Sequence, residues 1–218
     1  MTRHTRRARS ERHSPEDRSR KLLAAASRLF AQKGFHGTAV NDIIAAGGGS
    51  KATLAALFGN KAGIFGAVVA SFADRTARDI ALAGQTDDVA EGLLAAGNTL
   101  LRFYLSKAAL QGYRGVIATG PTETDVARRF YHDGHLRIVK ALADQLRQWR
   151  GKGLLICERP EEAADCFCHM LRHGVYEQVL IGLATRVPRA AIRHQAQWTV
   201  DAFLNGCARL GSTINPAP

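Results

Sequence analysis

The chain has 218 residues, a formal net charge of +11 at pH 7, 46% hydrophobic residues and 22% charged residues. This length and composition are those of a soluble globular protein with a sizeable core, in one large domain or two small ones. No run of about 18 apolar residues occurs, which excludes a transmembrane helix, and the four sparse cysteines are unlike those of a secreted disulfide scaffold. We therefore expect a cytoplasmic protein with reduced thiols.

The positive charge is concentrated near the N-terminus. Residues 1–61 contain 12 Lys and Arg against 4 Asp and Glu, whereas the remaining residues contain 18 against 15. A strongly basic N-terminal part beside a nearly balanced remainder predicts a head that binds a polyanion and a body with another task.

Residues 1–13 contain five arginines and almost no apolar side chains, so we expect them to be disordered in isolation. This segment is either a solvated tail or an arm whose arginines, including Arg6 and Arg7, enter a minor groove of DNA or lie along its phosphates. We favour the arm because the segment that follows has the features of a DNA-binding head.

The first helix is predicted to begin at Pro15, after the N-cap residue Ser14, and to end at Gly34. Its apolar side chains form one stripe at helical spacing, made by Leu22, Leu23, Ala26, Leu29 and Phe30. We expect Thr38 to cap a second helix.

Residues 39–61 predict two short helices joined by a tight turn. Each helix has an apolar face at helical spacing, formed by Val40, Ile43 and Ile44 in the first and by Leu54, Leu57 and Phe58 in the second. Three glycines at 47–49 separate the helices, and Ser50 is a good N-cap for the second one. Such a pair is either a helix-turn-helix, whose second helix enters the major groove of DNA, or an ordinary helical hairpin within a core.

The rest of the chain is predicted to be helical. Asn60 should cap a connecting helix over residues 61–83, a helical body should occupy residues 84–212, and residues 213–218 should form a loose tail. No stretch shows the alternation of a strand bounded by turn residues. In the body we expect helices from Thr86 or Asp87 to Leu105, around Gly112 and Gly115, from 121–124 to Trp149, from Pro160 to about Ala184, and from Pro188 to about Leu210.

The N-terminal third resembles the TetR family of bacterial transcriptional regulators. The matching features share one register and are Leu29-Phe30, Gly34-Phe35, Thr38, Asp42-Ile43, Gly48, Ser50-Lys51, Thr53-Leu54, Phe58, Lys61 and Phe65. The segments ARRFYHDGH and GKGLLICERPEEAADCF, in that order, are similar to the AefR-like C-terminal domain of some members. The resemblance favours the helix-turn-helix over the ordinary hairpin.

The resemblance implies an all-α fold, with a three-helix DNA-binding head over residues 14–61 joined by the connecting helix to a body that binds an effector and dimerises. It implies a ligand-responsive repressor that binds a palindromic operator as a homodimer and is released by a small molecule. The alternative is a degenerate member that binds an effector or a protein partner and contacts DNA weakly or without sequence preference. An unrelated helical enzyme is remote, because the sequence has no Gly-rich phosphate loop, nucleophile elbow or HExxH motif.

By resemblance, DNA contacts are expected from the arm, from the residues around the turn and from the start of the connecting helix. They are Arg6, Arg7, Thr38, Ser50, Lys51, Ala52, Thr53, Ala55 and Lys61. Family members usually have larger residues where this chain has Gly47, Gly49, Ala55 and Ala56. We expect the two glycines to destabilise the head, and the bare second helix to leave much of the DNA affinity to the arm and Thr38.

In the family, the last two long helices form the dimer interface. The penultimate helix of this chain carries on one face Ala163, Phe167, Met170, Leu171, Gly174, Gln178 and Ile181, and the last helix carries Ala191, His194, Trp198, Ala202 and Cys207. These faces suit a four-helix interface between two subunits, the alternative being burial within one subunit.

Aromatic and polar side chains are spread over the helices expected to surround an effector pocket. They are Phe103, Tyr104, Tyr113, Phe130, Tyr131, His135, His169, His173 and Tyr176. Aromatic rings with a few polar groups are typical of small-molecule sites, although each residue taken singly fits ordinary core packing better.

One stripe of potential metal ligands lies on the penultimate helix, formed by Glu162, Cys166, His169 and His173. These residue types suit zinc, but ligands on one helix rise too far to surround an ion, so Cys157 or Cys207 would have to complete the site. We favour a polar helix boundary with a buried thiol, and we expect no metal or cofactor.

Overall fold

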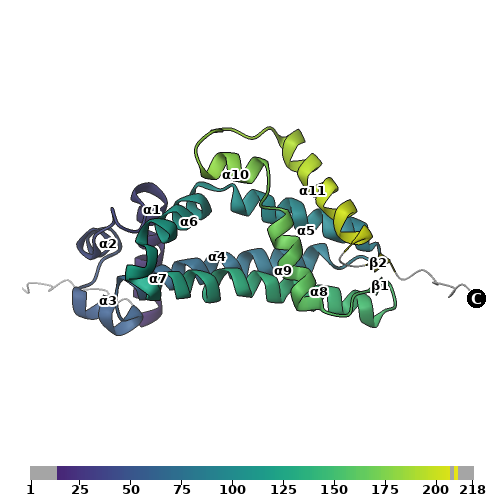
Figure 1. Cartoon of the computed structure of the whole chain (residues 1–218). Coiled ribbons are helices and arrows are strands. Elements are labelled where there is room, and N and C mark those ends of the chain that lie inside the picture. The colour runs from purple at the N-terminus through teal and green to yellow at the C-terminus, as the bar shows by residue number, and fades with distance from the viewer. Residues whose placement is uncertain (1–13, 207–208, 211–218) are drawn as a thin grey trace, which may run out of the picture.

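The computed structural model describes residues 14–206 and 209–210. The predicted arm, with Arg6 and Arg7, lies outside these residues, as do Cys207 and the predicted tail. The described chain has the predicted all-α fold, with a small head at one end and a longer helical body (Figure 1).

The elements follow one another with short connections. The head contains α1 (Pro15–Lys33), α2 (Val40–Gly47) and α3 (Lys51–Phe58), and α4 (Lys61–Ala83) leads into the body. The helices of the body are α5 (Val89–Tyr104), α6 (Lys107–Thr119), the 3-10 turn η1 (Gly120–Glu123), α7 (Thr124–Arg129), the π-helical segment η2 (Phe130–His135), α8 (Leu136–Gly151), α9 (Pro160–Met170), α10 (Val175–Leu180) and α11 (Arg189–Asn205).

The head folds around the predicted stripe of α1. Ser14, Ser50 and Asn60 cap α1, α3 and α4 as predicted, each accepting the backbone N–H of the residue three positions later, at 3.1, 3.1 and 2.8 Å. The buried residues of the head and its neighbours are Leu22, Ala26, Leu29, Phe30, Phe35, Ile43, Leu54, Ala62, Ile64, Phe65, Val68 and Val126.

The turn between α2 and α3 requires its glycines. Gly48 and Gly49 have φ angles of 82° and 98°, which L side chains rarely adopt. A Cβ on Gly47 would lie 2.9 Å from Cα of Leu22, so the absence of a side chain lets α2 approach α1. Both glycines therefore fit the backbone that this turn adopts, and the expectation that they destabilise the head stays a prediction.

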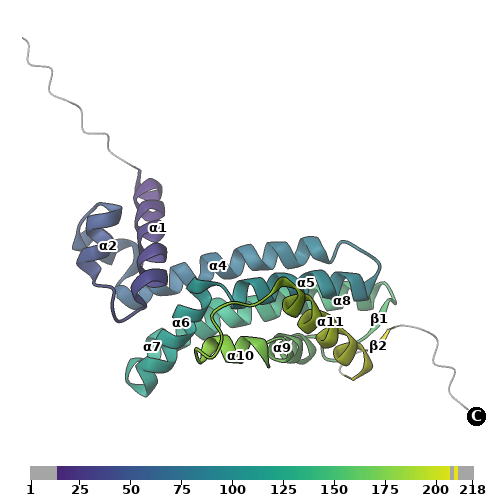
Figure 2. The same ribbon diagram turned by 90° about the horizontal axis from the view of Figure 1, so that it is seen from above.

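Helix α4 belongs to both parts of the molecule. Ile64, Phe65 and Val68 pack in the core of the head, whereas Ala73 and Ile80 pack in the core of the body. Figure 2 shows α4 leaving the head and running the length of the body beside α5 and α8, with which it is in contact. The connecting helix is thus a shared structural element.

Several predicted body helices differ from the observed ones. The helix predicted from Pro160 to about Ala184 ends at Met170, and α10 begins only after Gly174, whose φ is 61°. The helix predicted to end at Trp149 is interrupted by η2. Helix α6 runs without interruption through its two glycines, because packing stabilises the helix against their low propensity.

A pair of short strands, which the sequence did not predict, joins the segment after α8 to the segment after α11. Strands β1 (Leu155–Ile156) and β2 (Arg209–Leu210) pair antiparallel, with Leu155 opposite Leu210. Two residues are too few to show an alternating pattern. Helix α11 accordingly ends at Asn205 rather than near Leu210.

In the described residues no single helix is long and apolar enough to cross a membrane. Helices α3 and α4, which are bent by 56° relative to each other, reach that length and composition only as a pair.

Candidate DNA-binding surface and effector cavity

The exposed face of α3 offers few groups that can read a base edge. Its exposed positions are Lys51, Ala52, Ala55, Ala56 and Leu57. Ser50 and Thr53 carry hydroxyls, but Ser50 Oγ already accepts the Thr53 N–H and lies 3.0 Å from Thr53 Oγ1. Alanine can contact only the methyl group of thymine, so Lys51 is the main polar group on this face.

Two other predicted DNA contacts face the protein. The Thr38 side chain is fully buried, and its hydroxyl donates to the Gly34 carbonyl at 2.8 Å. Ala39 occupies the N-cap of α2, so the predicted Thr38 cap is wrong, and Thr38 is not available to a phosphate in this structure. Lys61 Nζ lies 4.4 Å from the centroid of the Phe35 ring, where burial lowers the Lys61 pKa.

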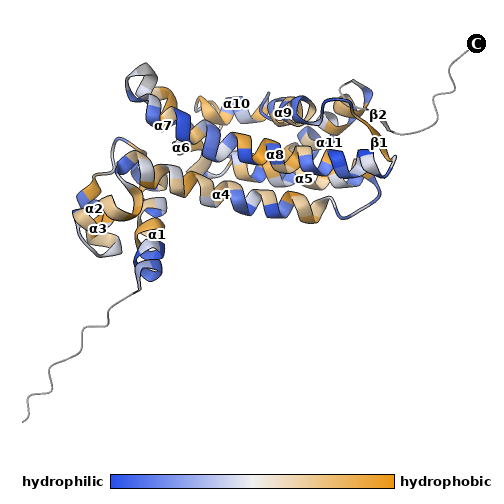
Figure 3. Ribbon diagram, turned by 90° about the horizontal axis from the view of Figure 1, so that it is seen from below, coloured by the Kyte–Doolittle hydropathy of each residue, from blue (hydrophilic) through white to orange (hydrophobic). Residues whose placement is uncertain are grey.

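Helix α1 adds basic groups that the sequence reasoning did not select. Arg18, Arg20, Lys21 and Arg28 are exposed on this helix. Figure 3 shows the contrast between the hydrophilic start of α1 and the largely apolar α2 and α3. The sequence contained a signal for these possible DNA contacts, namely four basic positions in an otherwise amphipathic helix.

A cavity of about 80 Å³ lies where the head meets the body. Six of the nine predicted pocket residues line it, namely Phe103, Tyr104, Tyr113, Phe130, His135 and Tyr176. The other three lie outside its lining, because the Tyr131 side chain is 50% exposed and His169 and His173 are exposed. Placing these three in the pocket was wrong.

The wall on the side of the head was not predicted. It is formed by residues of α1, α4 and the segment between α1 and α2, namely Ser27, Phe30, Ala31, Phe35, Phe65, Val68, Val69 and Phe72. In the sequence, the pattern of these residues predicts only ordinary core packing. Only the packing of α1 against α6 and α4 makes them a cavity wall.

The cavity lining includes one arginine, Arg172, which follows α9 and has nitrogen atoms that are unpaired within the described chain. Its Nε and Nη2 atoms are buried without a hydrogen-bond partner among the described residues. The guanidinium carbon lies 5.5 Å from the centroid of the Tyr104 ring, and the buried Tyr104 hydroxyl interacts with the Cys168 thiol. Burial raises the pKa of Tyr104 well above its usual range and that of Tyr176 to about 12, so both phenols are neutral at pH 7.

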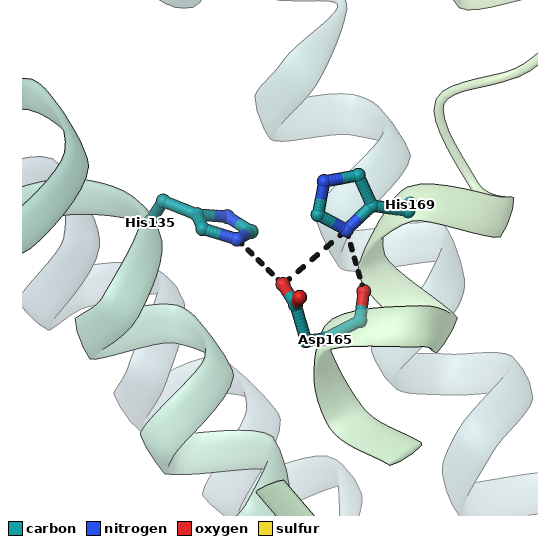
Figure 4. A group of neighbouring side chains, drawn as sticks. All are labelled: His135, Asp165 and His169. Carbon is teal, nitrogen blue, oxygen red and sulfur yellow. Dashed lines mark hydrogen bonds and ion pairs between the residues drawn. The ribbon is translucent and has the colours of Figure 1, made fainter. Parts of the chain in front are cut away.

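Next to this cavity, His135, Asp165 and His169 form a cluster whose ligand atoms lie within 4.8 Å of one another (Figure 4). His135 Nε2 lies 2.7 Å from Asp165 Oδ1, and His169 Nδ1 lies 3.2 Å from the same oxygen. Two imidazoles and a carboxylate can bind a divalent metal. Burial lowers the His135 pKa, and the positive charge of Arg172 lowers it further, so the His135 imidazole is favoured in its neutral form.

The metal-ligand stripe predicted on the penultimate helix does not assemble. Glu162 pairs with Arg159 at 2.8 Å. His173 lies past the end of α9, within 2.7 Å of Gln195 Nε2, because the helix stops at Met170. Cys166 is not part of the cluster of possible ligands found in the described chain.

The faces predicted for the dimer interface separate into two groups. Ala163, Phe167 and Leu171 are buried in the body of the single subunit, so assigning them to a subunit interface is wrong. Ile181 and Trp198, in contrast, are 65% and 49% exposed, and Leu183, which was not predicted, is 77% exposed nearby in the chain. These apolar residues come from the end of α10, the following loop and α11.

Comparison with protein families gives two matches. Residues 22–68 match the bacterial regulatory proteins of the tetR family, and residues 91–206 match the AefR-like transcriptional repressor C-terminal domain. The second match alone covers more than half of the chain. The protein belongs to the TetR family. It is a transcriptional regulator with a helix-turn-helix DNA-binding head, in a family that is not one of enzymes.

Solved structures of TetR-family proteins share the fold. A regulator from Mesorhizobium loti is 24% identical with a TM-score of 0.79, over 92% of this chain and 100% of that one. The flavonoid-responsive regulator FrrA is 24% identical with a TM-score of 0.67, over 88% and 97%. The fatty acid degradation regulator FadR from Bacillus halodurans is 16% identical with a TM-score of 0.66, over 90% and 98%. A comparison with curated proteins finds no match.

TetR-family regulators bind DNA and usually act as dimers. The head described above therefore forms the DNA-binding part of this TetR-family chain. The two-stranded sheet of β1 and β2 is a small addition to an all-α fold.

Proposed function

We propose that this TetR-family protein is a ligand-responsive repressor in the cytoplasm. Two copies bind a palindromic operator, with half-sites related by the ~34 Å repeat of DNA, and a small molecule in the cavity releases them. The observation that carries this proposal is the cavity itself, because its walls come from the head and from the body.

The size of the cavity supports a coupling between ligand and head. Small-molecule sites enclose roughly 300–1,000 Å³, whereas this cavity holds about 80 Å³. A ligand of ordinary size must therefore displace the walls formed by α1, α4 and α6. It shifts the head only to the extent that it binds the displaced arrangement more tightly than the original one.

Helix α6 extends this coupling toward α10. Arg114 Nε and Nη2 donate to the carbonyls of Leu180 and Val179, at 2.8 and 2.7 Å, at the end of α10. A displacement of α6 is thereby transmitted to the segment that carries Ile181 and Leu183.

These exposed apolar residues support a dimer through α10 and α11. We expect Leu183→Asp together with Trp198→Asp to convert the dimer to a monomer in analytical ultracentrifugation. Leu82→Asp is the matched control, because Leu82 is equally apolar and 64% exposed but lies at the end of α4. A double variant that stays dimeric would place the interface elsewhere.

Selection of bound duplexes from a random pool tests sequence-specific regulation directly. We expect the full-length protein to enrich one palindrome and to bind it more tightly than a scrambled duplex in fluorescence anisotropy. Lys51→Ala should weaken this binding, whereas Lys140→Ala, an exposed lysine on α8 paired with Asp144, should not.

The bare face of α3 favours one second candidate function. A member that binds an effector or a partner protein, and contacts DNA without sequence preference, would enrich no palindrome. Its affinity for the selected and the scrambled duplexes would be equal, and a cavity ligand would leave both affinities unchanged.

A further inference from the structure

We propose that the effector is an apolar molecule with a single carboxylate, and that Arg172 is the residue that binds this carboxylate. The inference rests on the proposed ligand-responsive function, and it specifies the chemical class of the ligand. Its starting point is the guanidinium of Arg172, which lines the cavity with two buried nitrogens that lack any hydrogen-bond partner among the described residues.

An arginine remains charged at all relevant pH values, and a buried charge without a counter-charge is strongly unfavourable. The carboxylate of Asp165, seven residues earlier on α9, contacts His135 and His169 instead of Arg172. The thiol of Cys168 is neutral as well, because burial raises its pKa to about 11. The described residues around Arg172 therefore supply no anion to pair with it.

A carboxylate fits this position in both charge and geometry. The guanidinium presents parallel N–H groups that match the two oxygens of a carboxylate. The Tyr104 ring lies under the same guanidinium, and its phenol is neutral, so it supplies no negative charge to Arg172. Two buried guanidinium nitrogens on one cavity wall, without a partner in the described chain, indicate an anionic oxygen ligand.

The remaining walls define the rest of the molecule. Apart from Arg172, His135, Ser27 and the tyrosines, the lining is formed by apolar side chains and glycines. Aromatic contacts lead from Tyr104 to Phe103 and from Phe103 to Phe72 of α4, with ring centroids 5.6 and 6.3 Å apart. The ligand would thus hold its carboxylate in the body at Arg172 and direct its apolar part toward the head.

This orientation distinguishes the proposed ligand from other classes. A cationic molecule is repelled by Arg172, and a neutral apolar molecule leaves the two buried nitrogens of Arg172 unpaired. A molecule with two or more charges would place a second charge among phenylalanine side chains. An amphipathic monoacid satisfies the polar end and the apolar wall together.

Matched acid and amide probes test the inference on the full-length protein. Isothermal titration calorimetry with decanoate and phenylbutyrate, each against its primary amide, separates the charge from the apolar part. We expect at least one acid to bind about 10- to 100-fold more tightly than its amide. Equal affinities within both pairs, or binding by neither acid, would overturn the proposal.

Variants of Arg172 identify the residue responsible. Arg172→Gln should remove the preference for the acid while leaving binding of the amide unchanged, and Arg172→Lys should restore part of it. Arg102→Gln, an exposed arginine on α5 outside the cavity lining, is the matched control and should keep the full preference. If the control loses the preference as Arg172→Gln does, the assignment to Arg172 fails.

The melting temperature of the ligand-free variants distinguishes a binding role from a structural one. Removing an unpaired buried charge should raise the melting temperature of Arg172→Gln above that of the parent. A lower melting temperature would show that Arg172 stabilises the fold, which contradicts the proposal.

DNA binding is measured separately, so that the two hypotheses can fail independently. If the acid binds through Arg172 but leaves DNA affinity unchanged, the regulatory function fails and the ligand class stands. If a neutral molecule releases DNA from both the parent and Arg172→Gln with equal potency, the ligand class fails and the regulatory function stands.

Discussion

The head and the body place their polar groups in opposite ways. On the head, the exposed face of α3 carries alanines at three positions and one lysine, where base recognition would require donors and acceptors. In the body, the half-buried Arg172 places two guanidinium nitrogens, unpaired among the described residues, in a largely apolar cavity, where packing alone would call for an apolar side chain. The face of α3 lacks the polar groups that DNA recognition suggests. The cavity, in contrast, contains a charged group that folding does not need.

The contrast indicates where recognition is located in each part. A bare α3 can still position the head in a groove, but affinity must then come from basic groups elsewhere, such as the N-terminal arm and the start of α1. A buried charge that destabilises the empty cavity is explained if a ligand neutralises it. Variants in each part can therefore strengthen or remove the contrast.

The largest expected effect concerns the stability of the body. Phe167 is fully buried and packs edge-to-face on Phe203, with ring centroids 5.1 Å apart. Phe167→Ala should lower the free energy of unfolding by about 3–5 kcal/mol, measured by urea denaturation. Leu82→Ala, at an exposed position, should change it by less than about 0.5 kcal/mol. A small effect at Phe167 would mean that the body tolerates a cavity there.

Removal of the arm should have the next largest effect, on DNA binding. Deleting residues 2–12 removes five arginines, and we expect operator affinity to fall by about 100-fold or more, with a shallower dependence on salt. Fluorescence anisotropy at several salt concentrations measures both quantities. Unchanged affinity and an unchanged salt slope would show that the head binds DNA without the arm.

The helix-turn-helix turn offers a test of the glycine geometry. Gly49→Val should destabilise the head by about 1–2 kcal/mol, because valine is strained at a φ of 98°. Thermal unfolding of this variant is compared with that of Ala46→Val, an exposed helical position of α2 where the φ angle is ordinary. A more stable Gly49→Val would show that the turn relaxes to the geometry usual in the family.

A smaller gain is expected from adding a polar group to α3. Ala55→Tyr should raise DNA affinity by about fivefold, which corresponds to one hydrogen bond of about 1 kcal/mol. Ala55→Phe is the matched control, since it adds the ring without the hydroxyl. Equal affinities of the two variants would assign the gain to apolar contact alone.

The smallest effect is a pH dependence in the body. Burial lowers the pKa of His135 below its usual value of 6.5, against the opposing hydrogen bond from Asp165, and Arg172 and His169 lower it further. As the pH falls, the unfolded chain takes up a proton on this histidine before the folded chain does. The contribution of neutral His135 to stability is therefore complete above pH 6.5, and it is lost as the pH falls through the lower pKa of the folded state. Urea denaturation between pH 7.5 and 5 should show a shallower decline for His135→Gln than for the parent. Parallel declines would mean that His135 does not contribute.

Much of the fold could be predicted because the information is local. The stripe of α1, the caps Ser14, Ser50 and Asn60, and the two short helices of the head depend on residues three or four positions apart. The errors arose where distant contacts decide. Thr38 looked like a cap but is buried with its hydroxyl bonded to the Gly34 carbonyl. The helix after Pro160 ends at Met170, and a new helix begins after Gly174, which has a positive φ.

The candidate sites divide in the same way. The sequence by itself determined the family, the all-α class, the basic N-terminal part and the set of aromatic residues in the body, since each is a matter of composition, spacing or motif. The tertiary structure decided that α1 and α4 complete the cavity wall and that Arg172 lies over Tyr104 without a counter-charge. Those two facts depend on contacts between residues far apart in the chain, which no periodicity records, because burial and electrostatic pairing are properties of the packed molecule.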